Sequence, residues 1–331
     1  MKIKLFLISV VCFCAQLLIA QENKELKFND KKEFKIVQFT DIHYVTDSLN
    51  SEVSINLMKK AIEQEKPDLI VFTGDVITCR PQKNGWDNVL QIPIDYKIPF
   101  AVILGNHDDE YDWTRRQIMD YVQTKPYSLG KNGPENIKGA SNYTLTILGS
   151  KDNSVKSVLY FLDSNAYNKA GDRKGYDWFA FNQVEWYRQQ SELFTKANNG
   201  VPYPSLAFFH IPLQEYSLLS DSTKFQSIGT RGENECPGIL NSGMFTAFYD
   251  CKDVMGTFVG HDHNNDYIGC IAGICLAYGR FTGSKNTYTD IGNGYRIIIL
   301  KEGERTFDTW IRTGEGDKLH SISYPDSLTK N

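Results

Sequence analysis

Five of the six histidines in this chain directly follow apolar, strand-like runs, and this pattern constrains the fold more than any other feature. Near the C-terminal end, Gly260-His261-Asp262-His263 places two histidines two residues apart after such a run. His43, His107 and His210 follow earlier runs, and only His320 lies outside the pattern. Because ligands of open α/β sheets bind beyond the carboxyl ends of the strands, we expect these histidines to meet in one pocket.

The first hundred residues predict strand and helix segments in alternation. Apolar runs at 34–40, 68–73 and 100–104 each end in a polar loop, and residues 51–65 have helical spacing of apolar side chains. Three such units in a row indicate an α/β domain with a largely parallel sheet at this end.

The rest of the chain has a more antiparallel character. Residues 142–148 and 157–162 predict a hairpin, and Asn182 to Glu185 resembles a capping box that opens a helix to about residue 197. Runs at 274–278, 296–300 and 306–311 suit a second sheet. We expect one domain over residues 34–315, a flexible lead-in over 21–33 and a polar tail over 316–331.

Residues 1–20 predict a secretory signal peptide and therefore a secreted or periplasmic protein. Lys2 and Lys4 precede an apolar run that ends at Ala20, a small residue at a plausible cleavage point. The alternative is a retained anchor, but the run is shorter than the ~20 residues of a spanning helix. We expect no membrane span once this segment is cleaved.

The charge balance argues against a nucleic-acid polymer as partner. The formal net charge is −4, and 41% of the residues are hydrophobic, which is enough for a large core. A net negative chain lacks the broad basic face that binds polyanions, although a local pocket could still bind a small phosphate ester.

The cysteines allow two close disulfide pairs in an oxidising compartment. Cys236 could pair with Cys251 and Cys270 with Cys275, which leaves Cys79 unpaired. The alternative is that all five are small buried residues.

The strand-end loops offer oxygen and imidazole ligands without a thiolate, which suits zinc, iron, manganese or cobalt. They offer too many ligands for one tetrahedral ion, so we expect two ions about 3.5–4 Å apart. Taken singly, an Asp-x-His or Gly-Asp motif is most often a turn, but the joint occurrence favours a metal site. The candidate side chains are Asp41, His43, Asp75, Asn106, His107, His210, His261 and His263.

The ordered series of motifs resembles the signature of the calcineurin-like metallophosphoesterase superfamily. The matching motifs are Asp41-x-His43, Gly74-Asp75, Gly105-Asn106-His107-Asp108, His210 and Gly260-His261-x-His263. Flanking stretches resemble the purple-acid-phosphatase-like branch of plants and fungi, whose members are not purple. Thr78 stands where the true purple enzymes have a tyrosine ligand, so no iron–tyrosinate chromophore is expected.

The resemblance implies a four-layer α/β/β/α sandwich of two mixed β-sheets flanked by helices. It implies a first metal on Asp41, His43 and His263, a second on Asn106, His210 and His261, and Asp75 as the bridge. A metal-activated hydroxide would attack phosphorus, His107 would protonate the leaving alkoxide and Asp108 would orient His107. Iron, zinc and manganese are the expected metals.

The expected function is hydrolysis of small phosphomonoesters. The alternatives are a phosphodiesterase acting on nucleotides or lipid head groups and a non-catalytic metal-binding homologue. No substrate contact is assigned, although Arg80, Arg231, Arg280 and Tyr44 lie near the motifs in sequence. Asp262 is either a partner of one histidine ligand or a solvent-facing turn residue.

Overall fold

Two stacked β-sheets form the centre of the molecule. The structure is a computed structural model and describes residues 25–168 and 174–328. The predicted signal peptide over 1–20 therefore lies outside the described residues and stays a prediction. Within the described ranges, no helix is long and apolar enough to cross a bilayer.

The six-stranded sheet has the order β16-β15-β14-β2-β3-β4. Its parallel half, β2 to β4, comes from the three apolar runs of the N-terminal third, and every residue of β3 is buried. β14 to β16 extend it in antiparallel fashion. The bounds are β2 Glu33–Phe39, β3 Leu69–Thr73, β4 Phe100–Ile103, β14 Gly294–Lys301, β15 Phe307–Thr313 and β16 Lys318–Tyr324.

The eight-stranded sheet has the order β1-β5-β6-β9-β11-β13-β12-β10. Its centre, β6-β9-β11-β13, is parallel, and β5 pairs with β6 as the predicted antiparallel hairpin. The bounds are β1 Leu26–Lys27, β5 Tyr143–Leu148, β6 Val155–Phe161, β9 Ser205–Phe208, β10 Ser227–Ile228, β11 Val254–Val259, β12 Ile268–Ile271 and β13 Ile274–Tyr278.

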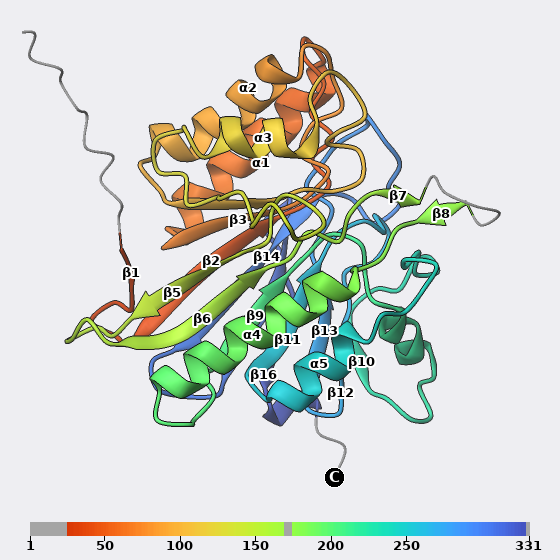
Figure 1. The fold of residues 1–331 in the computed structure, drawn as a ribbon. Helices are drawn as coiled ribbons and strands as arrows, with labels where there is room; N and C mark the ends of the chain where they lie inside the picture. Colours follow the sequence, from red (N-terminus) through yellow and green to blue (C-terminus); the bar gives the residue numbers. More distant parts are fainter. Residues whose placement is uncertain (1–24, 169–173, 329–331) are drawn as a thin grey trace, which may run out of the picture.

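Helices cover the outer faces of both sheets, which confirms the expected four-layer sandwich (Figure 1). α1 (Leu49–Glu65), α2 (Gln82–Asp95) and α3 (Arg115–Val122) lie on the side of β2 and β3. α4 (Phe181–Ala197) and α5 (Met244–Cys251) lie on the side of β9 and β11. A separate pair, β7 (Tyr167–Asn168) and β8 (Gly175–Tyr176), projects from the edge of the sandwich; η1 (Gln214–Ser220) and η2 (Asp326–Leu328) are short 3-10 turns.

Several expectations about the elements need correction. The run at 274–278 joins the eight-stranded sheet, whereas 296–300 and 306–311 join the N-terminal strands in the other sheet. β1 pairs with β5 and buries Leu26, and β16 pairs with β15, so both ends of the expected 34–315 domain extend further. α4 begins two residues earlier than the predicted box: its N-cap is Ala180, whose N–H donates to the side chain of Gln183.

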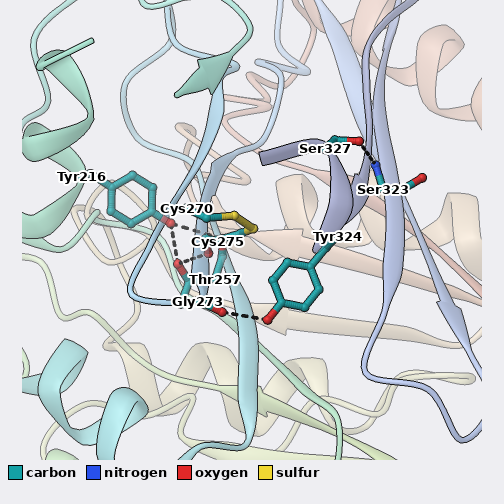
Figure 2. The surroundings of a disulfide bond; sticks show 8 residues. All are labelled: Tyr216, Thr257, Cys270, Gly273, Cys275, Ser323, Tyr324 and Ser327. Carbon is teal, nitrogen blue, oxygen red and sulfur yellow. Dashed lines mark hydrogen bonds between the residues drawn. A yellow bond between two sulfur atoms is a disulfide. The ribbon is translucent and has the colours of Figure 1, made fainter. Parts of the chain in front are cut away.

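One of the two candidate disulfides is present. Cys270 and Cys275 are directly opposed on β12 and β13, with Cα atoms 3.9 Å apart, and their sulfurs are bonded (Figure 2). The Tyr324 hydroxyl donates to the carbonyl of Gly273 at the hairpin tip, 2.8 Å away. The predicted Cys236/Cys251 pair is wrong, because Cys236 lies in an exposed loop and Cys251 ends α5.

Opening the disulfide should lower stability modestly, because it closes a loop of only a few residues. We expect Cys270→Ser to reduce the free energy of unfolding by about 2 kcal/mol, through the added entropy of the unfolded chain. Urea unfolding of the non-reduced protein measures this. The control Cys236→Ser changes an exposed cysteine that forms no disulfide in the described chain, and its free energy of unfolding should equal that of wild type. An equal loss of stability in both variants would contradict the prediction.

Candidate metal centre

The polar loops that follow β2, β3, β4, β9 and β11 converge at one end of the two sheets. The loop after β2 hydrogen-bonds to the loop after β3: the N–H groups of Asp41 and His43 donate to the carbonyls of Gly74 and Asp75, at 3.1 and 3.0 Å. The loops after β9 and β11 are joined by a Gly260 N–H that donates to the His210 carbonyl. Motifs more than two hundred residues apart in sequence therefore share one site.

The first cluster consists of Asp41, His43 and His263, all buried. The Nε2 atoms of His43 and His263 are 3.2 Å apart, and His263 Nε2 is 3.6 Å from Asp41 Oδ1. His263 donates its other ring N–H to the carbonyl of Tyr288 at 2.9 Å, which leaves Nε2 as the metal-binding atom.

The second cluster consists of Asp75, His210 and His261, also buried. Asp75 Oδ2 lies 3.1 Å from Nε2 of His210 and 3.8 Å from Nε2 of His43, so one carboxylate faces both clusters. His210 is fixed like His263, because its Nδ1 donates to the carbonyl of Thr73 at 2.7 Å. This arrangement is the one expected of a bridging ligand between two ions.

Unpaired ligand atoms in this site fit metal ions. Asn106 Oδ1 and His261 Nε2 are buried and form no hydrogen bond with the described residues. Leaving such atoms buried and unsatisfied is costly, and a cation held between them removes that cost. The donor set of carboxylate, amide and imidazole suits iron, zinc or manganese and does not distinguish among them.

The ligand loops have unusual backbone conformations. Asp41, His43 and Asp75 have φ values of 52°, 46° and 50°. Such conformations are costly for non-glycine residues and are typical of functional sites. The neighbouring glycines permit close packing: a Cβ at Gly105 would lie 2.2 Å from Asp75 Oδ1, and one at Gly260 would lie 1.9 Å from Thr40 Oγ1.

The charges of the buried ligands are strongly coupled. Burial opposes ionisation of Asp75, but the facing imidazoles of His210 and His43 outweigh it and hold the pKa of that carboxyl well below its usual range. Burial would lower the pKa of His210, yet Asp75 and Asp41 raise it to about 9. Burial lowers the pKa of His43 to about 3, so that ring is neutral and ready to bind a metal.

His107 differs from the ligands because its side chain is 35% exposed. Its Nδ1 is 2.8 Å from Glu110 Oε2, and its backbone N–H donates to Asp75 Oδ1 at 2.8 Å. Burial opposes protonation of the ring, but Asp75 and Glu110 outweigh burial and raise its pKa. A cationic imidazole at the open side of the cluster could donate a proton to a leaving group.

Asp108 does not orient His107, contrary to expectation. Its fully buried carboxylate accepts backbone N–H groups instead, from Gly105 and Asp75 on Oδ2 and from Val76 and Ile77 on Oδ1, at 2.8–3.2 Å. Asp108 therefore ties the loop after β4 to the loop after β3. Glu110, which lies three residues after His107 and just beyond the motif, makes the contact that the sequence suggested for Asp108.

The other polar candidates have structural partners. Arg231 pairs with Glu235 and Arg280 with Asp266, so both guanidinium groups already have carboxylate partners. Arg80 is largely exposed beside Asp112, and the Tyr44 hydroxyl is buried and accepts from Asn88. Neither expectation for Asp262 is met: its buried carboxylate accepts from the Tyr278 hydroxyl and the Cys236 N–H.

Three tyrosines beside the metal ligands were not anticipated. Tyr288 stacks on His263 at 4.4 Å between ring centroids, and Tyr176 meets His261 edge-on at 4.3 Å. The Tyr167 hydroxyl accepts a hydrogen bond from Asn106 Nδ2 at 2.8 Å. They lie outside the motifs, and nothing in the sequence around them marks them.

Comparisons with known proteins show the family of this chain. Residues 34–265 match the family of calcineurin-like phosphoesterases, and the chain belongs to that family. It is 36% identical to "Probable inactive purple acid phosphatase 29" of Arabidopsis thaliana, over 82% of this chain and 78% of that one. It is 33% identical to "Probable inactive purple acid phosphatase 14" of the same plant, over 93% and 87%.

A solved structure shares the fold. A dimetal phosphatase from Danio rerio superposes with a TM-score of 0.61 at 13% identity, covering 88% of this chain and 98% of that one. The purple-acid-phosphatase-like resemblance inferred from the motifs is thus confirmed at the level of the family. The roles of individual residues stay predictions.

The two clusters predict separable losses of metal. His263→Ala removes a ligand of the first cluster only, so we expect metal content to fall from about two ions per chain to about one. Asp75→Ala, which removes the carboxylate facing both clusters, should reduce it further. Elemental analysis after reconstitution with Mn²⁺ measures this; unchanged content in both variants would contradict the site.

The new role of Asp108 predicts a loss of stability. Asp108→Ala leaves four backbone N–H groups without their acceptor, and we expect the free energy of unfolding to fall by at least about 3 kcal/mol. The control Glu110→Ala, at an exposed carboxylate, should change it by less than about 0.5 kcal/mol. Chemical denaturation compares the two variants. An Asp108→Ala protein with the wild-type free energy of unfolding would contradict the role of Asp108 in joining the two loops.

Proposed function

We propose that the protein is a metal-dependent phosphohydrolase that acts on small phosphomonoesters. The supporting observation is the pair of buried clusters that face one carboxylate, Asp75 Oδ2, beside a half-exposed His107. Two bound metal ions would lower the pKa of a water molecule and neutralise charge on the phosphoryl oxygens.

The residues of this chain would supply the rest of the chemistry. Asp41, His43 and His263 would hold one ion, and Asn106, His210 and His261 the other, with Asp75 between them. Their burial excludes bulk water from the clusters. His107 in its cationic form would donate a proton to the leaving oxygen, and Glu110 on its Nδ1 would fix the orientation of the ring.

A cleft next to this site could accept the leaving alcohol. It has a volume of about 350 Å³, at the small end of the range for ligand sites, and its walls include Asn106, Glu110 and Tyr167. The cleft is also lined by two cationic side chains, Arg115 and Lys138. Both already have carboxylate partners: Arg115 pairs with Asp163 and Lys138 with Asp177. Such a lining favours a small, uncharged alcohol over a group with a second phosphate.

Turnover of a chromogenic phosphomonoester and of its bis-ester, with Mn²⁺ or Zn²⁺ added, tests this function. We expect the monoester to be hydrolysed faster. His107→Ala should lower kcat by roughly 10²–10⁴-fold without changing metal content, because it removes only the proton donor. His320→Ala, at a histidine that faces Asp266 and belongs to neither cluster, is the matched control and should retain wild-type kcat.

Each other outcome has a distinct meaning. Turnover of the bis-ester alone would replace the proposal with a phosphodiesterase. Two bound metals without turnover of either ester would indicate a metal-binding protein that lacks this activity.

A further inference from the structure

The side-chain amide of Asn106 must present its oxygen to serve as a metal ligand, and one contact satisfies the amide nitrogen in that orientation. Its oxygen is buried and has no hydrogen-bond partner among the described residues, whereas its nitrogen donates to the Tyr167 hydroxyl at 2.8 Å. An amide nitrogen cannot bind a metal, so a rotation of the amide by half a turn would remove the ligand.

The Tyr167 hydroxyl is itself held in place. Its ring stacks on Tyr176 with centroids 5.6 Å apart, and Tyr176 in turn meets His261 edge-on at 4.3 Å. On the other side, the Tyr167 ring meets the His107 ring edge-on, with ring centroids 6.3 Å apart. The β7–β8 pair, which projects at the edge of the sandwich (Figure 1), thus spans from the Asn106 loop to the His261 loop.

We propose that Tyr167 is a positioning residue for the second metal, which holds the Asn106 amide with its oxygen turned toward the ion. This inference rests on the metal centre of the proposed function but does not require turnover. The hydroxyl accepts the amide N–H, so Asn106 Oδ1 is the only ligand atom that this side chain offers.

The strongest test is the metal affinity of the purified full chain. Partners that orient a metal ligand typically contribute 10–100-fold to metal affinity. We expect Tyr167→Phe, which keeps the ring and removes the hydroxyl, to weaken binding of one of the two Mn²⁺ ions by 10–100-fold in calorimetric titration. The other ion should bind as in wild type.

Tyr176→Phe is the matched control on the same β-strand pair. It also loses one hydroxyl and keeps its ring against His261, but no hydrogen bond joins that hydroxyl to a metal ligand among the described residues. Its affinity for both ions should equal that of wild type. Equal weakening in the two tyrosine variants would overturn the proposal, as would a Tyr167→Phe protein with two wild-type affinities.

A double-mutant cycle with Asn106→Asp separates orientation from a general loss of structure. A carboxylate has two equivalent oxygens and needs no hydroxyl to select one. In the Asn106→Asp background, Tyr167→Phe should therefore change metal affinity by less than about 3-fold. A loss as large as in the Asn106 background would overturn the proposal. Absence of ester turnover in wild type with both ions bound would overturn only the proposed function.

Discussion

The site depends on the buried carboxylate of Asp108 and the four backbone N–H groups that it accepts. Beyond the ends of β3 and β4 the chain no longer has ladder partners, so its N–H groups need other acceptors. The two carboxylate oxygens of Asp108 accept the N–H groups of Gly105 and of residues 75–77. Without Asp108, the carboxylate of Asp75, which faces both clusters, would lie on a loop with unsatisfied N–H donors.

This constraint explains how one short motif performs several tasks. Gly105 has no side chain, so the loop can approach Asp75 closely, and Asn106 follows with its amide buried. His107 turns outward, where Glu110 meets it, and Asp108 turns back into the protein. Asn106 therefore faces the metal site, His107 faces solvent, and Asp108 binds the backbone. The short loop fixes the relative positions of the three side chains.

The sequence was sufficient to predict which polar side chains lie together at the sheet ends, but not the residues that support them. Apolar runs that end in His, Asp or Asn indicated which side chains meet, because strand ends of parallel sheets share an edge. The motif could not distinguish the inward turn of Asp108 from the outward turn of His107, which depends on the positions of N–H groups thirty residues earlier. Tyr167 reaches the site from β7 and Tyr288 from the loop before β14, and no local pattern encodes such contacts.

The same reasoning explains the errors in the sheets and the cysteines. The run at 274–278 and the run at 296–300 are both apolar and strand-like, so composition could not assign them to different sheets. β1 is only two residues long, yet its pairing with β5 buries Leu26 and orders a segment that is charged in sequence. Cys270 and Cys275 pair because they are opposed across a hairpin, a geometric condition that Cys236 and Cys251 do not meet.

The charge balance of the two clusters supports the proposed phosphohydrolase function, because that function would not require an arginine to bind the phosphate. Asp41 and Asp75 are the only carboxylates in the two clusters, and Asn106 and the histidines can all bind as neutral ligands. Two carboxylates do not cancel two divalent ions, so a loaded centre would retain positive charge. That surplus of positive charge would attract a phosphate dianion directly. Arg231 and Arg280 would not be needed for this attraction, and their ion pairs with Glu235 and Asp266 stabilise the fold. An aspartate in place of Asn106 would reduce the surplus, so the neutral amide is consistent with a centre that binds and polarises a phosphate ester.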